Sequence, residues 1–277
     1  MTSTDAHTPG SLRIGWIGAG RMGAAMASRL AFTMVSTPAD LEQVLVGEGG
    51  LLADPGQVPG VVVDCSTVSQ ESSAAMREAC RERGVDFLAS PVSGNGKVVT
   101  SGGLSLVVSG PEETYLKVAP LLEHLGKGAT YVGDGDVARL AKICHNLMLG
   151  VVTQCLAEIT VLAEKGGMPR AAFLEFLNNS VMGSVFTRYK SPAFVNLDYT
   201  PTFTPLLLRK DFDLGFAAAH DLDVPMPVAA ATAAAVQASV SSGRVTEDFA
   251  ILLDLQAAAS GITLKSEDVP VDDGLGG

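Results

Sequence analysis

The sequence lacks the patterns that mark several common classes of protein. Its 277 residues include only four cysteines, without CxxC spacing, so neither a disulfide framework nor a cysteine metal site is expected. Its four histidines form no HxH or HxxxH pair, and no GxSxG elbow occurs, so zinc and serine hydrolases find no support. No run of about 18 uninterrupted apolar residues is present, and the polar first residues lack the apolar core of a secretory signal. We therefore expect no metal, no membrane span, and free thiols in the cytoplasm.

Positive charge is also scarce. The chain has 19 Lys and Arg against 30 Asp and Glu, a formal net charge of −11, and no basic cluster interrupts this excess. A polyanion would therefore be repelled, and neither nucleic acid nor an anionic membrane surface is expected as a partner. The length exceeds that of a usual single domain, so two domains are expected.

Short apolar runs alternate with helical stretches through the first half of the chain. The alternation is typical of a parallel α/β sheet, and we assign residues 1–133 to one α/β domain. The predicted strands are Leu12–Ile17, Phe32–Val35, Val61–Asp64, Phe87–Ala89, Leu104–Val108 and Thr130–Val132. The predicted helices between them are Met22–Leu30, Ala39–Val46, Gln70–Glu82 and Glu112–His124.

The pattern changes after Gly133. Apolar residues recur every three or four positions from Val137 to Leu162, which predicts one long helix that ends at Gly166 and Gly167. Only helical segments follow, so residues 134–277 are predicted to form this long helix and an all-helical domain. The last residues, 265–277, are acidic and rich in glycine, and we expect them to be disordered.

A glycine turn with GxGxxG spacing, at Gly18, Gly20 and Gly23, follows the first predicted strand and opens a helix. This placement favours a dinucleotide site, because the glycines allow a tight turn and a close approach of the pyrophosphate to the helix N-terminus; a turn without a ligand is the alternative. The acid expected about 20 residues on is missing. Asp40 has nearly that spacing, but it follows Thr37 and Pro38 and is better explained as part of a helix cap.

Five motifs occur in the order of one family. They are Gly18-Ala19-Gly20-Arg21-Met22-Gly23, Asp64-Cys65-Ser66-Thr67, Ser90-Pro91-Val92-Ser93-Gly94-Asn95-Gly96, Lys142-Ile143-Cys144-His145-Asn146 and Lys210-Asp211. With them the chain resembles the 3-hydroxyisobutyrate dehydrogenase, or β-hydroxyacid dehydrogenase, family from Arg13 to about Gly261. That family includes tartronate semialdehyde reductases.

The resemblance implies an α/β fold with an N-terminal doubly wound, mostly parallel Rossmann domain, a long connecting helix and a helical C-terminal domain. It also implies a homodimer or homotetramer made through the helical domain. The implied reaction moves a hydride between NAD or NADP and a small 3-hydroxy acid, or reduces the matching semialdehyde. The implied substrate is a small carboxylate.

The resemblance also carries roles for the residues of the site. Ser93 and Gly94 would bind the substrate carboxylate, and Asn95, where many members have glycine, would add an amide to that pocket. Lys142 would be the catalytic acid and base, with Asn146 as its orienting partner. The implied cofactor residues are Gly18, Gly20, Arg21, Met22 and Gly23 at the pyrophosphate, Val35, Ser36 and Thr67 along the cleft, and Lys210 from the helical domain.

Each of these roles has an alternative. Lys142 and Asn146 are four residues apart, so they share a helix face, but such a pair also occurs on solvated helix surfaces. His145 is an alternative base, the Ser93-Gly94 segment is an alternative simple turn, and Asp211 and Asp213 are better explained by structural contacts than by catalysis. An imine reductase on the same scaffold is the enzymatic alternative, and Lys142 argues against it because that position is commonly Asp or Tyr there.

One departure from the family follows Leu30. Between Gly23 and Pro38 there is no Gly, Pro or Asn, so a helix and a strand abut without turn chemistry. Joining them directly would need a left-handed crossover, which occurs in about 2% of cases. We expect that a few tens of residues are missing after Leu30, by omission rather than by real truncation. A real truncation would favour a catalytically inactive Rossmann binding module, and in either case the residues that choose NAD or NADP are lacking.

Overall fold

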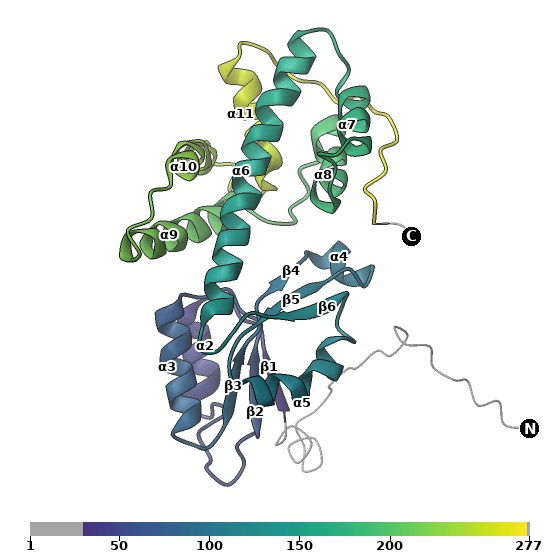
Figure 1. Cartoon of the computed structure of the whole chain (residues 1–277). Helices are drawn as coiled ribbons and strands as arrows, with labels where there is room; N and C mark the ends of the chain where they lie inside the picture. The colour runs from purple at the N-terminus through teal and green to yellow at the C-terminus, as the bar shows by residue number, and fades with distance from the viewer. Residues whose placement is uncertain (1–29, 276–277) are drawn as a thin grey trace, which may run out of the picture. The chain divides into compact units, whose positions relative to one another are not determined.

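A computed structural model describes residues 30–275 of the chain, drawn in colour in Figure 1, in two compact units. The first, here the sheet unit, contains the described residues up to Gly94 together with Val98–Lys142. The second, here the helical unit, contains Asn95–Lys97 and the described residues from Ile143 onward. The predicted strand Leu12–Ile17 and the glycine turn Gly18–Gly23 lie outside the described residues.

The sheet unit alternates strands and helices as the sequence predicts, with bounds close to the predicted ones. Its elements are β1 (Leu30–Thr33), α2 (Pro38–Val46), β2 (Val61–Asp64), α3 (Gln70–Arg81), β3 (Asp86–Ala89), β4 (Val92–Ser93), α4 (Gly96–Thr100), β5 (Ser105–Val108), α5 (Glu112–Leu122) and β6 (Gly128–Tyr131). The short elements β4 and α4 were not predicted. Thr37 caps α2 and bonds with Asp40, which confirms the cap interpretation of that acid.

The sheet is mixed rather than wholly parallel. Strands β1, β2 and β3 are parallel in that order, and β5 is parallel to β6. The two groups meet at an antiparallel bridge between Ala89 and Ser109, and β4 runs antiparallel to β5. The direction therefore reverses after β3, at the predicted substrate loop.

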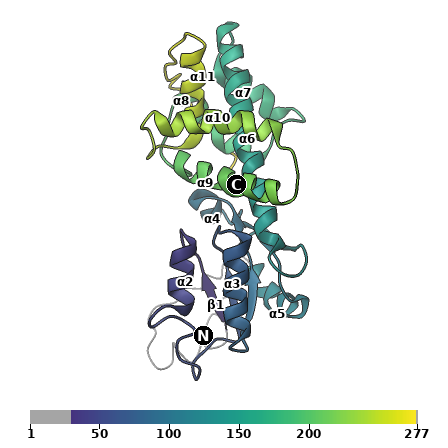
Figure 2. The ribbon, with the colours of Figure 1, turned by 90° about the vertical axis from the view of Figure 1, so that its left-hand side faces the viewer.

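Alternate residues along the strands face opposite layers of helices. Val62 and Phe87 belong to the core formed with α2 and α3, whereas their neighbours Val63 and Leu88 belong to the core formed with α5. Figures 1 and 2 show α2 and α3 together on one face of the sheet and α5 on the other. Both faces are covered, which explains the consecutive apolar residues Val61–Val63 of β2 and Phe87–Ala89 of β3.

The start of the sheet corrects one prediction. The sequence predicts Leu30 at the end of a helix, but Leu30 begins β1, where it pairs with Val61 and Ala31 pairs with Val62. The strand predicted at Phe32–Val35 therefore lies two residues earlier. The apolar run after residue 30 satisfies helix and strand patterns alike, and pairing with β2 decides between them.

The helical unit is built on the long helix α6 (Val137–Lys165), which begins in the sheet unit. Gly167, with φ of +86°, ends it, and Met168 N–H donates to Ala163 O at 3.0 Å, as the sequence predicts. The other elements are α7 (Arg170–Asn179), α8 (Val185–Asn196), α9 (Pro205–Asp221), α10 (Pro227–Ser241), the 3-10 turn η1 (Phe249–Ile251) and α11 (Leu252–Ala259).

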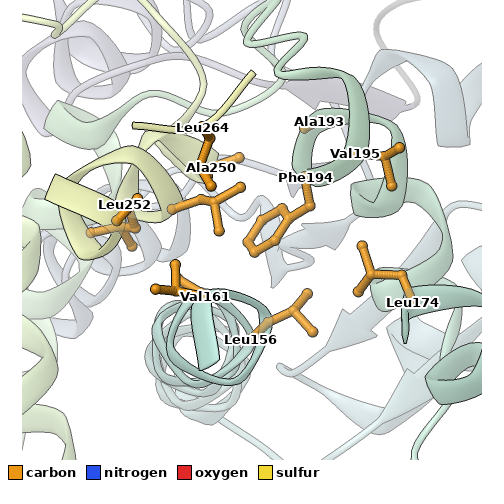
Figure 3. Packing of buried hydrophobic residues seen from close by; sticks show 12 residues of the cluster. Leu156, Val161, Leu174, Ala193, Phe194, Val195, Ala250, Leu252 and Leu264 are labelled. Carbon is orange, nitrogen blue, oxygen red and sulfur yellow. The ribbon is translucent and has the colours of Figure 1, made fainter. Parts of the chain in front are cut away.

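Helix α6 supplies residues to the cores of both units. Figure 3 shows Phe194 of α8 at the centre of one cluster, with Leu156 and Val161 of α6 and Leu252 of α11 around it. Among the described residues, α6 is the one helix long and apolar enough to cross a membrane by length and composition. Core helices meet the same criterion, and the buried side chains of α6 give it that role here.

The acidic tail is bound to the helical unit, contrary to the disorder that its composition suggests. The Glu267 carboxylate accepts the N–H groups of Arg170, at 2.6 Å, and Ala171, at 3.0 Å, at the start of α7. The buried Arg170 guanidinium donates to Lys265 O, and Asn196 donates to Val269 O at 2.8 Å. An acid at a helix N-terminus neutralises unpaired amides and the helix dipole, and these contacts hold tail residues 265–269 on the helical unit.

The four thiols divide into two classes that labelling can distinguish. Cys65 and Cys80 are buried, and burial raises the pKa of each to about 12, whereas Cys144 and Cys155 are exposed on α6. Since the thiolate is the reactive form, we expect a thiol reagent at neutral pH to modify Cys144 and Cys155 rapidly and the other two only after unfolding. Peptide mass spectrometry of native and denatured samples measures this. Equal labelling of all four thiols in the native protein would contradict the burial described here.

Candidate functional site

The carboxyl ends of β1, β2 and β3 form one edge of the sheet, as parallel neighbours must. Val35 and Ser36 follow β1, and Thr67 follows β2, so three of the predicted cofactor residues lie at this edge. The Val35 N–H donates to Ser66 Oγ at 2.9 Å, which ties the two strand ends together. Ligands of open α/β sheets bind at this edge. The other predicted cofactor residues of this domain, Gly18, Gly20, Arg21, Met22 and Gly23, lie outside the described residues.

A buried ion pair holds this edge in place. Asp64 and Arg139 are 0% and 1% exposed, and Arg139 Nη2 lies 2.5 Å from Asp64 Oδ2. The other carboxylate oxygen accepts from Thr33 Oγ1 at 2.7 Å and from Ser66 Oγ at 2.6 Å. Burial lowers the pKa of Arg139, and the charge of Asp64 opposes this effect. The pair therefore connects β1, β2 and the first turn of α6.

The sequence gives little indication of this pair. Asp64 belongs to the Asp64-Cys65-Ser66-Thr67 motif, and Arg139 belongs to none of the five motifs. The available signal was a charged residue in an otherwise apolar segment of α6, since a buried arginine needs an acid. Its partner is 75 residues away and cannot be identified by spacing.

The predicted carboxylate loop begins in a strand. Ser93 belongs to β4 and pairs with Ser105, so the segment is more than the simple turn considered above. Gly94 has φ of +142°, and a Cβ there would lie 2.8 Å from Val98 Cγ1, so a larger residue would be strained and crowded. Asn95 follows, half-buried, before α4.

The predicted residues of the helical unit meet where α9 packs on α6. Asn146 is 4% and Asp211 1% exposed, and Asn146 Nδ2 donates to Asp211 Oδ2 at 2.5 Å. Lys210 Nζ lies 3.6 Å from the other oxygen of Asp211. His145 Nδ1 lies 2.8 Å from Asn146 Oδ1. Asp211, assigned above to a structural contact, is therefore the direct partner of a predicted catalytic residue.

Two glycines set the spacing of this helix pair. A Cβ on Gly150 of α6 would lie 2.4 Å from the Phe212 ring of α9. A Cβ on Gly215 of α9 would lie 2.6 Å from Leu147 of α6. A large side chain of each helix thus packs against a glycine of the other helix. This close approach places Asn146 against Asp211.

Lys142 lies on α6 one helical turn before Asn146 and is half-buried. The two residues share a helix face by their spacing. Among residues 30–275 no group of three or more His, Cys, Asp or Glu side chains could hold a metal ion.

Two family models match consecutive parts of the chain. One, described as the NAD binding domain of 6-phosphogluconate dehydrogenase, matches residues 28–133. The other, described as NAD-binding of NADP-dependent 3-hydroxyisobutyrate dehydrogenase, matches residues 133–256. The boundary between them coincides with Gly133, where the sequence pattern changes from α/β to helical.

Individual proteins match over most of the chain. The 2-(hydroxymethyl)glutarate dehydrogenase of Eubacterium barkeri is 30% identical over 242 residues, 87% of this chain and 80% of that protein. The 3-hydroxyisobutyrate dehydrogenase of Pseudomonas aeruginosa is 30% identical over 210 residues, 73% of this chain and 70% of that protein. A solved 3-hydroxyisobutyrate dehydrogenase from Salmonella typhimurium has a similar fold, with a TM-score of 0.73, 24% identity, and coverage of 82% of this chain and 79% of that one.

Proposed function

We propose, because this chain belongs to the 3-hydroxyisobutyrate dehydrogenase family, that it transfers a hydride between NAD or NADP and a short 3-hydroxy acid, or reduces the matching semialdehyde. The family is one of NAD(P)-dependent oxidoreductases that act on CH–OH groups. The observation that carries the proposal is the pair of NAD-binding family matches, which together extend without a break from residue 28 to residue 256.

The names of the two relatives indicate the chemical class of the substrate. Both 3-hydroxyisobutyrate and 2-(hydroxymethyl)glutarate contain a primary alcohol on the carbon next to the one that bears a carboxylate. We propose that this unit is recognised here, with Ser93 and the N–H of Gly94 on the carboxylate. Asn95 would add an amide to this pocket and favour a substituent that hydrogen-bonds.

The remaining residues of the site are assigned either to cofactor binding or to proton transfer. Val35, Ser36 and Thr67 at the sheet edge, the glycine turn, and Lys210 would hold NAD or NADP, which accepts the hydride when bound. Lys142 would take the hydroxyl proton in the oxidation and return it in the reduction. Asn146, fixed by Asp211, would orient the same oxygen. We also propose a cytoplasmic location and a homodimer or homotetramer.

The break that the sequence predicts after Leu30 enters this proposal. The NAD-binding family match begins at residue 28, after the Gly18–Gly23 turn, and β1 begins at Leu30. We propose that a segment carrying the adenosine-binding strand belongs before β1 rather than directly after Leu30, because Leu30 and Ala31 are consecutive residues of that strand, paired with Val61 and Val62. The intact mass of the purified natural protein tests this: 28.6 kDa would mean a real truncation, and a mass several kDa larger would supply the segment.

The alternatives are an imine reductase and an inactive Rossmann module. Lys142 argues against the first, and the second gains weight only if the truncation is real. Cofactor titration followed by thermal shift distinguishes an active dehydrogenase from the inactive module, because a ligand that binds the folded state raises its stability. No shift at millimolar NAD or NADP would favour an inactive module.

Initial rates with a panel of short hydroxy acids test the proposal directly. We expect reduction of NAD or NADP with 3-hydroxy acids that carry a free carboxylate, and much slower turnover of their methyl esters or amides, because Ser93 and Gly94 then lose their anionic partner. Turnover of cyclic imines instead of hydroxy acids would support the alternative enzyme.

A further inference from the structure

A polar pocket lies within the helical unit, and none of the residues assigned above to substrate, cofactor or proton transfer lines it. The C-terminal tail runs past α7 and α8 (Figure 1), and its residues Pro270–Asp272 line the pocket together with residues of those two helices. The volume of the pocket is about 410 Å³, within the range of roughly 300–1,000 Å³ that is typical of small-molecule sites. The pocket is therefore large enough for a small organic ligand.

Arg188 of α8 brings a positive charge to this pocket. Its side chain is half-buried, and Nη2 donates to Asn178 O at 2.6 Å. Gly274 of the tail packs against the same side chain, since a Cβ on Gly274 would lie 3.0 Å from Arg188 Cδ. Within residues 30–275 no acid forms an ion pair with Arg188. A guanidinium has five N–H donors and matches a carboxylate in shape, so Arg188 can bind a carboxylate here.

The side chain of Asn178 has an unused acceptor at the same place. Asn178 Nδ2 donates to Ser191 Oγ at 2.8 Å, and Ser191 Oγ donates to Thr187 O at 2.8 Å, which fixes the orientation of the amide. Asn178 is 8% exposed, and its Oδ1 accepts no hydrogen bond from any described residue. Buried acceptors in native proteins are nearly always paired. An N–H group of a ligand in the pocket would supply the missing donor.

The other side chains of the pocket indicate what the ligand carries besides a carboxylate. Glu175 and Asp272 are exposed acids that line it, and they favour a positive group. Leu174, which is 1% exposed, lies on the same helix as Glu175 and provides an apolar surface. Since Arg188 is bonded to the main chain of Asn178, the positive charge and the unused acceptor lie close together. The negative and positive groups of the ligand must therefore be separated by only a few bonds.

We propose that this pocket binds an α-amino acid with an apolar side chain. The carboxylate accepts hydrogen bonds from Arg188. The ammonium, which has three donors and no acceptor, donates to Asn178 Oδ1 and faces Glu175 and Asp272. The apolar side chain lies against Leu174. The proposal does not rest on the proposed hydride transfer, and it makes the tail part of a ligand site.

Calorimetric titration of the whole protein with L-leucine tests this site, with two matched probes. Isoamylamine is leucine without its carboxylate, and 4-methylpentanoate is leucine without its ammonium. We expect saturable binding of L-leucine and much weaker binding of both probes. Bound leucine should also slow hydrogen exchange of the amides of residues 271–275, because a ligand that binds the folded state stabilises the segment that it contacts.

Two variants assign the binding to this pocket. Arg188→Gln removes the charge but keeps an amide, and it should raise the dissociation constant for L-leucine at least about tenfold, as expected for loss of a charge-assisted hydrogen bond. Glu175→Gln changes an exposed residue and should raise it about threefold. Arg81→Gln, an exposed arginine of α3, is the matched control and should leave it unchanged.

Several results would overturn the proposal. These are absence of L-leucine binding at millimolar concentration, equal affinity of Arg188→Gln and the parent, and binding of 4-methylpentanoate as tight as that of L-leucine. If Arg188→Gln does not fold, an unchanged affinity of Glu175→Gln overturns it instead.

Lys142→Met separates this site from the proposed dehydrogenase site. The variant should bind L-leucine as the parent does, whatever its turnover, and this result would support a separate pocket. Leucine binding that is lost in Lys142→Met but kept in Arg188→Gln would assign the amino acid to the dehydrogenase site, and the pocket proposal would then be wrong while the proposed function stands.

Discussion

Replacement of Lys142 by methionine is expected to lower kcat for oxidation of the hydroxy acid by about 10³, within the range that a direct general acid or base contributes. Methionine keeps the length and packing of the side chain but cannot accept a proton. The dissociation constant for NAD(P)H should stay nearly unchanged, because Lys142 is not among the residues assigned to cofactor binding. Steady-state rates and cofactor fluorescence titration measure the two effects.

The control for this variant is Lys117→Met, on the exposed side of α5. It removes the same charge from the same unit and should leave kcat and cofactor affinity as they are. A Lys142→Met enzyme with kcat close to that of the parent would remove Lys142 from the chemistry.

Replacement of Arg139 by methionine should lower the free energy of unfolding by about 3–5 kcal/mol, the usual effect of leaving one member of a buried pair alone. The Asp64 carboxylate, 0% exposed, would lose its counter-charge in the sheet core. We also expect weaker cofactor binding, because Arg139 donates to Ser66 O and Ser66 holds the end of β1. Denaturant titration and cofactor binding are the measurements.

Two comparisons make the Arg139 prediction specific. The double variant Asp64→Asn with Arg139→Met removes the uncompensated charge and should regain a large part of the lost stability. Arg81→Met removes an arginine from an exposed pair with Glu78 and should leave stability nearly unchanged. A stability of Arg139→Met equal to that of Arg81→Met would contradict the account of the sheet edge.

Local pattern was sufficient for much of the fold. The alternation of short apolar runs with helices predicted the strands β2 to β6, apart from β4, and the 3.6-residue period predicted α6 with its glycine end. β1 was displaced because Leu30 fits a helix and a strand equally well, and only pairing with Val61 decides. The prediction that the tail is disordered was wrong for the residues around Glu267, because composition does not show that the Glu267 carboxylate binds the start of α7.

The candidate site depended more on distant contacts. Spacing along α6 put Lys142 and Asn146 on one face, and strand ends put Val35, Ser36 and Thr67 on one edge. The bonds of Asn146 to Asp211 and of Asp64 to Arg139 join residues 65 and 75 positions apart, and no periodicity relates them. Those bonds depend on how α9 packs on α6 and on where α6 starts, which only the folded chain determines.

Transfer of deuterium from the substrate carbon to the cofactor is the most direct test of hydride transfer by this chain. A 3-hydroxy acid deuterated at the carbinol carbon is incubated with the enzyme and NAD or NADP, and the reduced cofactor is analysed by mass spectrometry. We predict one deuterium in the nicotinamide ring and its absence with the Lys142→Met variant over the same time. Formation of the semialdehyde without deuterium in the reduced cofactor would contradict the assignment.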